Sequence, residues 1–156
     1  MKSRASIGNH PLHPAMVAVP IGAFFLALLA DLGFLSDGRP FWAEMSLIAV
    51  CVGVATALIA AVLGFIDFTG LPDGSRVRGI AIYHMVINLA AVLLYTVSAY
   101  LRWSFGPPYS PSVIALAASF FALAILMVGG WLGGKMVFEL RAGVVEPADL
   151  VPRVRV

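Results

Sequence analysis

The chain has 156 residues, of which 61% are hydrophobic and 12% are charged, and its formal net charge is +2. A soluble domain carries about a quarter charged residues, so this composition excludes a water-soluble globular protein. The basic residues are scattered rather than clustered with aromatic residues, which excludes a nucleic-acid-binding patch. The single cysteine, Cys51, excludes an internal disulfide and a cysteine-ligated metal site, and we expect it to be a small buried hydrophobic residue.

Four apolar stretches of about 20 residues are each long enough to cross the hydrocarbon core of a bilayer as a helix. They cover residues 16–35, 45–66, 80–101 and 113–132. The connections between them are short and rich in glycine and proline, so consecutive helices are expected to be antiparallel. The sequence therefore predicts an all-α integral membrane protein, an up-down four-helix bundle. Residues 1–14 form an N-terminal segment, 15–141 the transmembrane domain and 142–156 a tail.

The distribution of basic residues predicts the orientation of the bundle. Four crossings place both termini and the second connector on one side of the membrane. That side holds eight basic residues, namely Lys2, Arg4, Arg76, Arg78, Lys135, Arg141, Arg153 and Arg155. The other side holds only Arg39 and Arg102. Since positive charge accumulates on the cytoplasmic side, both termini are expected to be cytoplasmic. The first stretch is not expected to be a signal peptide, because no small-residue cleavage site ends it.

Two histidines, each followed by a proline, precede the first apolar stretch. Proline disfavours helical geometry in the residue before it, so we expect extended backbone at His10 and His13. Pro14 has the fixed φ that suits the first turn of a helix. His13 is thus predicted to cap the first span, and His10 to lie just outside it.

The third histidine lies within a predicted span. His84 is about one turn into the third span, which enters from the same side as the first, and Asp67 lies near the end of the second. Asn88 follows His84 by one helical turn. Ionisable groups in a span cost at least about 2 to 3 kcal/mol at the bilayer centre, which predicts a site facing the bundle interior. Two structural alternatives are that Asp67 lies at the interface or caps a turn, and that His84 donates to a backbone carbonyl.

Two further features of the spans are an acidic residue in the first span and a glycine-rich segment at the end of the fourth. Asp31, near the other end of the first span, is expected to cap a helix end or to form an interfacial ion pair beside Glu44 or Arg102. The fourth span ends in a glycine-rich segment, residues 129–134, which lets another helix or a flat cofactor approach closely. We expect Asn88, Trp131, Gly133 and Gly134 to support a histidine site.

Several motifs together resemble one family. They are His-Pro-Leu-His-Pro (10–14), Pro-Ile-Gly (20–22), Ala-Asp-Leu (30–32), Gly-Phe-Ile-Asp (64–67), Tyr-His-Met with Asn88 (83–88) and Gly-Trp-Leu-Gly-Gly (130–134). In this order they resemble the bacterial membrane-protein family catalogued as domain of unknown function 2231, over about residues 8–145. The resemblance implies a four-span protein of the bacterial inner (plasma) membrane without an established activity. Some relatives are joined to cytochrome c or Rieske-type iron–sulfur domains, which implies redox work. This sequence has no Cys-x-x-Cys-His motif, so a redox partner is expected to be a separate protein.

Two classes of function remain open. In the first, His84 with His13 or His10 binds a b-type haem, or His10, His13, His84 and Asp67 hold a non-haem transition metal. In the second, the chain binds no cofactor and is a structural or accessory subunit, or a small proton or solute carrier that uses Asp67 and His84. The expected partners are the lipid bilayer, a separate redox protein and further copies of the chain. No catalytic motif decides whether the protein is an enzyme.

Overall fold

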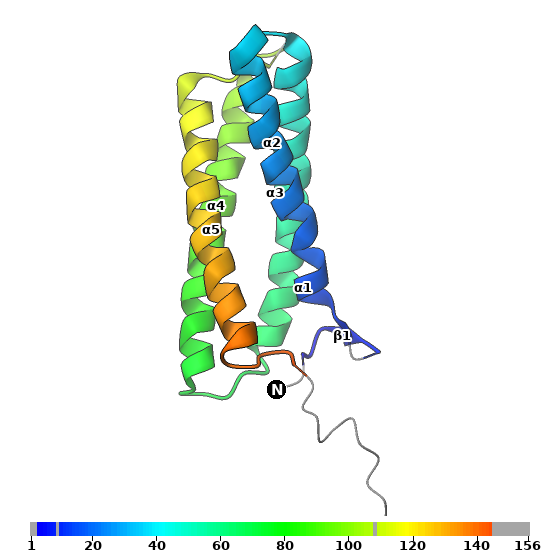
Figure 1. Ribbon diagram of the computed structural model, residues 1–156, viewed down its shortest axis with the longest axis vertical. Coiled ribbons are helices and arrows are strands. Elements are labelled where there is room, and N and C mark those ends of the chain that lie inside the picture. The colour runs from blue at the N-terminus through cyan, green and yellow to red at the C-terminus, as the bar shows by residue number, and fades with distance from the viewer. Residues whose placement is uncertain (1–2, 9, 108, 145–156) are drawn as a thin grey trace, which may run out of the picture.

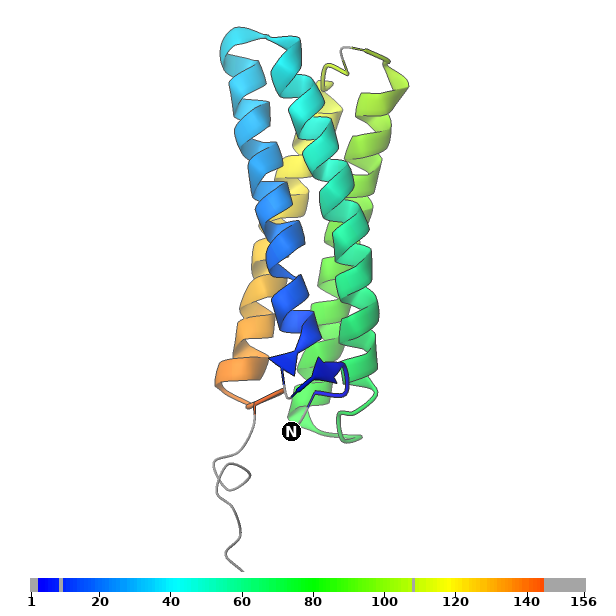
Figure 2. The same cartoon turned by 90° about the vertical axis from the view of Figure 1, so that its right-hand side faces the viewer.

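The structure, a computed structural model, describes residues 3–8, 10–107 and 109–144. Its helices are α1 (Leu12–Met16), α2 (Ala18–Asp37), α3 (Pro40–Phe68), α4 (Arg76–Ser104) and α5 (Val113–Phe138). They are preceded by an antiparallel hairpin of two short strands, β1 (Ser6–Ile7) and β2 (His10–Pro11). The long helices run up and down side by side, with the strands, the α3–α4 connection and the end of α5 at one end of the bundle (Figures 1 and 2). The predicted tail lies outside the described residues from residue 145 onward.

Four helical segments are long and apolar enough to span a membrane. They are Leu12–Asp37, Pro40–Phe68, Arg76–Ser104 and Val113–Phe138. At most a third of each apolar window is buried inside the structure, so most of their apolar side chains face outward. Such a surface is stable in lipid, where helices also satisfy their own backbone hydrogen bonds. The up-down bundle of four spanning helices predicted from the sequence is confirmed, and each helix extends a few residues beyond its predicted window.

The first span is interrupted near its beginning, and this changes the position expected for His13. α1 ends at Met16 and α2 begins at Ala18, because Pro20 has no N–H to donate to the Met16 carbonyl. His10 is extended in β2, as predicted, but the expectation of extended backbone at His13 is wrong: it is the second residue of α1. The preference of a residue before proline is outweighed here by the hydrogen bond of the His13 ring to a backbone carbonyl of α3.

The core of the bundle consists of small side chains around one aromatic pair. Phe24 of α2 stacks on Tyr95 of α4, with ring centroids 3.7 Å apart and planes only 4° from parallel. The other buried members of this cluster are Ala27, Ala49, Val50 and Ala122. Small residues let helices approach closely, and close packing is what drives helix association in lipid. α2 packs mainly on α3, and α4 mainly on α5.

Cys51 is exposed on α3, so the expectation that it is buried is wrong. That expectation holds for soluble proteins, in which an apolar side chain gains free energy by leaving water. On a membrane-spanning helix the side chain leaves water equally well by facing the lipid tails. Burial inside the protein is therefore not required.

A buried polar network joins the four long helices near the end away from the N-terminal strands. It consists of Asp31 of α2, Ser46 of α3, Ser98 and Arg102 of α4, and Ser119 of α5. The network places an ion pair deep among apolar helices, since Arg102 is 0% and Asp31 4% exposed. Arg102 is the partner that the sequence suggested for Asp31, and the pair is buried between the helices.

Every N–H of the Arg102 guanidinium has an acceptor in this network. Nη1 donates to Asp31 Oδ1 at 2.7 Å and to Ser46 Oγ at 2.9 Å. Nη2 donates to Asp31 Oδ2 at 2.8 Å and to Ser119 Oγ at 3.3 Å, and Nε donates to Ser98 Oγ at 3.1 Å. A guanidinium has five N–H donors. A buried charge is tolerated only when it is paired and hydrogen-bonded, and here both conditions are met.

Candidate functional site

Two of the three histidines come together between the first and third spans. The rings of His13 (α1) and His84 (α4) have centroids 6.3 Å apart, and their planes are perpendicular, at 89°. His84 lies eight residues after Arg76, the first residue of α4, or about 12 Å along the helix. The pair therefore lies inside the bundle, toward the end that carries the N-terminal strands.

Each imidazole is fixed by a hydrogen bond to the backbone of a different neighbouring helix. His13 Nδ1 lies 2.8 Å from the carbonyl oxygen of Ala60 on α3, and His84 Nδ1 lies 2.9 Å from that of Gly129 on α5. A carbonyl only accepts, so Nδ1 carries a proton in each ring, and in the neutral form of an imidazole protonated there Nε2 carries the lone pair. This confirms the structural alternative for His84, donation to a backbone carbonyl, and leaves its second nitrogen for a ligand.

The two Nε2 atoms are open. Within the described residues neither has a hydrogen-bond partner, and no side-chain nitrogen or oxygen there is both buried and unpartnered. Each Nε2 is therefore accessible rather than sealed into the packing. An accessible lone pair on a ring held in place from behind is the arrangement typical of metal-ligating histidines.

Glycines next to the two rings make room for them. A Cβ atom on Gly64 of α3 would lie 2.9 Å from His13 Cε1, and one on Gly133 of α5 would lie 3.1 Å from His84 Cε1. Any larger residue at these positions would push the imidazoles away. The sequence did not assign Gly64 to the site, although Gly64 begins the Gly-Phe-Ile-Asp motif at residues 64–67. In the structure it lies one helical turn after Ala60, the acceptor for His13.

The remaining residues expected to support the site divide into two groups. Asn88 donates to the backbone oxygen of His84 at 2.7 Å, and a Cβ on Gly129 would lie 2.6 Å from its amide, so this glycine admits the Asn88 side chain. Trp131 is 65% exposed, with the Lys135 ammonium 5.2 Å from its ring centroid, and Gly134 approaches no other helix. Asn88 and Gly133 thus contact the His84 region, whereas Trp131 and Gly134 do not.

Asp67 is hydrogen-bonded to the N-terminal segment, and His10 is part of that segment. Asp67 Oδ1 accepts hydrogen bonds from Ser3 Oγ at 2.7 Å and from the Ala5 amide at 2.8 Å, and His10 is exposed in β2. In the part of the chain that the structure describes, no three His, Cys, Asp or Glu side chains are placed to hold a metal ion. The structure therefore brings together His13 and His84, and does not gather them with His10 and Asp67 into a four-residue metal site.

Replacing Asp67 with alanine is expected to release the N-terminal segment from α3. The substitution removes the acceptor of the buried Ala5 amide, at a cost of about 1 to 3 kcal/mol in local stability. Limited trypsin digestion should then cleave after Arg4 faster than in the wild-type protein. The control is Asp73→Asn, because the Asp73 side chain is 94% exposed. Equal cleavage rates in D67A and wild type would contradict a fastening role for Asp67.

Comparison with known proteins bears on the fold and the family. No curated protein and no solved structure matches the chain. A family model described as "Predicted membrane protein (DUF2231)" matches residues 9–146, which include all four apolar helices and the histidine pair. The chain is therefore a multi-pass membrane protein that belongs to the DUF2231 family of predicted membrane proteins.

Proposed function

We propose that the protein binds a b-type haem through His13 and His84 and transfers electrons in the bacterial inner membrane, with its termini in the cytoplasm. The bias of eight basic residues against two supports this orientation. The single observation that carries the function is the perpendicular pair of imidazoles with open Nε2 atoms. A separate redox protein is the expected partner.

The spacing of the two rings suits ligation of one ion from opposite sides. A bond between a metal and an imidazole nitrogen is about 2.0 to 2.1 Å long, so two trans imidazoles have centroids about 6 Å apart. The centroids of His13 and His84 are 6.3 Å apart. His13 and His84 are therefore the two residues that would hold the ion.

The donor set favours haem over a bare metal ion. A protein site for a bare transition metal supplies three or four ligands, but no group of three metal-ligating side chains occurs within the described residues. A haem iron already has four porphyrin nitrogens, and in b-type electron carriers the protein adds two axial ligands. Two neutral imidazoles are therefore a complete protein contribution for haem and an incomplete one for a bare ion.

The rest of the chain orients the ligands and limits the access of water. The hydrogen bonds from Nδ1 to Ala60 and Gly129 hold the ring planes and increase the basicity of Nε2. The apolar helices around the pair lower the local dielectric constant, which tunes a bound haem's potential. When bound, the haem would supply one-electron chemistry.

The test is the visible spectrum of the protein purified in mild detergent. The wild-type protein is expected to show a Soret band, and His13→Ala and His84→Ala are each expected to lose it. His10→Ala is the matched control, because His10 is exposed in β2, and it should keep the full band. The perpendicular ring planes further predict a strongly anisotropic low-spin ferric signal in electron paramagnetic resonance. Size-exclusion profiles would verify that each variant is folded.

Three outcomes would overturn the assignment. If the wild-type protein stays colourless after incubation with excess haem but contains one equivalent of transition metal, the histidines form a bare-metal site. A colourless and metal-free protein would support a cofactor-free accessory subunit or carrier instead. Equal loss of colour in H10A, H13A and H84A would show that the ligands are not the pair identified by the geometry.

A further inference from the structure

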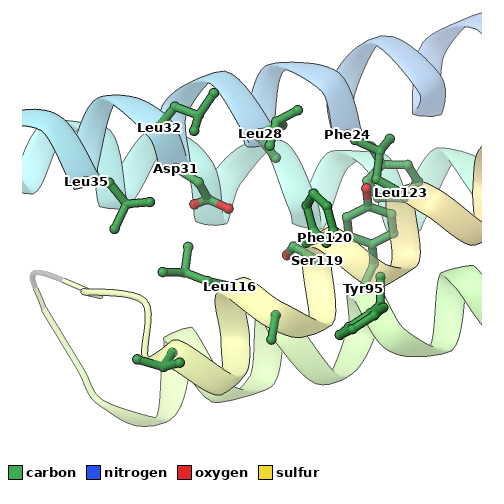
Figure 3. Close-up of a pocket in the computed structure, with 14 residues that line it drawn as sticks. Phe24, Leu28, Asp31, Leu32, Leu35, Tyr95, Leu116, Ser119, Phe120 and Leu123 are labelled. Atoms are coloured by element: carbon green, nitrogen blue, oxygen red, sulfur yellow. The ribbon is translucent and has the colours of Figure 1, made fainter.

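A second site lies at the other end of the bundle, well separated from the histidines. A partly open cavity of about 350 Å³ is lined by residues of α2, α4 and α5 (Figure 3), a volume within the range of small-molecule sites. Its inner wall includes the buried Phe24, Ala27 and Tyr95. Side chains on its rim are 53% to 81% exposed, namely Leu32, Leu35, Val113, Phe120 and Phe121. Since these apolar side chains face lipid, the cavity opens sideways into the bilayer.

Tyr95 carries a hydroxyl without a protein partner on the inner wall of this cavity. The residue is 1% exposed, and its ring is held by stacking on Phe24. The Tyr95 hydroxyl makes no hydrogen bond to any described residue. However, no side-chain nitrogen or oxygen of the described residues lacks both a hydrogen-bond partner and accessible surface. The Tyr95 hydroxyl therefore keeps some accessible surface, and Tyr95 is one of the residues that line the cavity. A buried O–H normally has an acceptor, so this one is available to a ligand.

The other polar groups of the cavity are already engaged. Figure 3 shows Asp31 and Ser119 on facing helices at its wall. Both Asp31 oxygens accept from Arg102, and Ser119 Oγ is bonded to Ser98 and Arg102. The charges of the pair cancel locally, and the remaining wall is apolar. A charged ligand would be poorly solvated there, whereas a neutral ligand with one hydrogen-bond acceptor fits the available donor.

We propose that this cavity binds the carbonyl-bearing ring of a membrane-soluble quinone. The ring would lie between apolar and aromatic walls with one carbonyl accepting from Tyr95 Oη, and its apolar tail would leave through the lipid-facing rim. A lipid acyl chain also fits apolar walls, but it has no acceptor for the Tyr95 hydroxyl. The proposal does not depend on haem binding, because Tyr95 lies eleven residues, about 16 Å along α4, from His84.

The experiment measures binding of a decyl-substituted benzoquinone to the full chain in lipid nanodiscs, by the ligand-induced rise in melting temperature across a titration. Decylbenzene, which has the same tail but no carbonyl, is the matched ligand. Tyr95→Phe removes only the hydroxyl and is expected to weaken quinone binding by about tenfold. Thr96→Val is the control variant, since Thr96 is exposed and bonds only within its own helix. Ala117→Phe would fill the cavity and is expected to abolish binding.

Each outcome decides the proposal. Saturable quinone binding that is weakened in Y95F, blocked in A117F and unchanged in T96V supports it. Equal binding of decylbenzene and the quinone, or no loss in Y95F, overturns it and indicates an acyl-chain site. Absence of quinone binding by a protein that nevertheless shows a Soret band overturns this proposal alone. A colourless protein that binds quinone overturns the haem proposal alone.

Discussion

Arg102→Met is expected to lower the free energy of unfolding by about 3 to 5 kcal/mol. The substitution keeps an unbranched apolar side chain in place of the arginine stem but leaves the Asp31 carboxylate buried with no cation, in a position that is 4% exposed. It also removes the donor shared by Ser46, Ser98 and Ser119. The four helices would then lose the group that ties them together.

Unfolding by sodium dodecyl sulfate in mixed micelles, followed by circular dichroism, measures this loss. The double variant Asp31→Leu/Arg102→Met removes both charges and is expected to recover most of the stability, because a buried pair is often worth little more than apolar packing. Arg39→Ala is the matched control, since its ion pair with Asp37 is exposed at the same end of the bundle. If R102M and R39A were equally stable, the buried network would not be a structural clamp.

Gly53→Ala is expected to destabilise the bundle by about 1 to 3 kcal/mol, although alanine is the better helix former. The added Cβ would overlap the Phe24 ring, with one ring carbon only 2.6 Å away. Phe24 cannot retreat freely, because its other face stacks on Tyr95 at 3.7 Å. The single methyl group would therefore separate α2 from α3 or break the stacked pair.

The control for this prediction is the same substitution at an open glycine. Nothing lies within 4 Å of a Cβ built on Gly22 of α2, so Gly22→Ala is expected to leave stability unchanged or to raise it by up to about 1 kcal/mol. Thermal unfolding of both variants in the same detergent compares them directly. Equal melting temperatures would mean that the contact between Gly53 and Phe24 does not limit the packing.

The spanning helices were predictable because lipid imposes a single requirement on them. A segment that crosses the bilayer must be helical and apolar over about 20 residues, which a linear sequence displays directly. The approach of His13 to His84 followed from depth and connectivity, since the first and third spans enter from the same side. The interruption of the first span before Ala18 was harder to predict from the sequence. It arises because Pro20 has no N–H, so one backbone carbonyl of the preceding turn has no donor.

The polar contacts were harder to predict, because they depend on which face of each helix turns inward. Ser46, Ser98 and Ser119 are single serines in apolar runs, and serine occurs on either face of a membrane helix. Only the assembled bundle aligns them with Arg102. The contacts of Asp67 were also not predictable. Its hydrogen-bond donors are residues 3 and 5, and no pattern in that segment predicts a contact with α3.

The Asp31–Arg102 pair also constrains how the protein is made. Its two members lie 71 positions apart in the chain, on the first and third spans. During synthesis Asp31 and Ser46, which donates to Asp31 in the complete bundle, are both made before Arg102. A nascent chain of two spans thus carries a carboxylate without its cation. Stable assembly has to await the third helix.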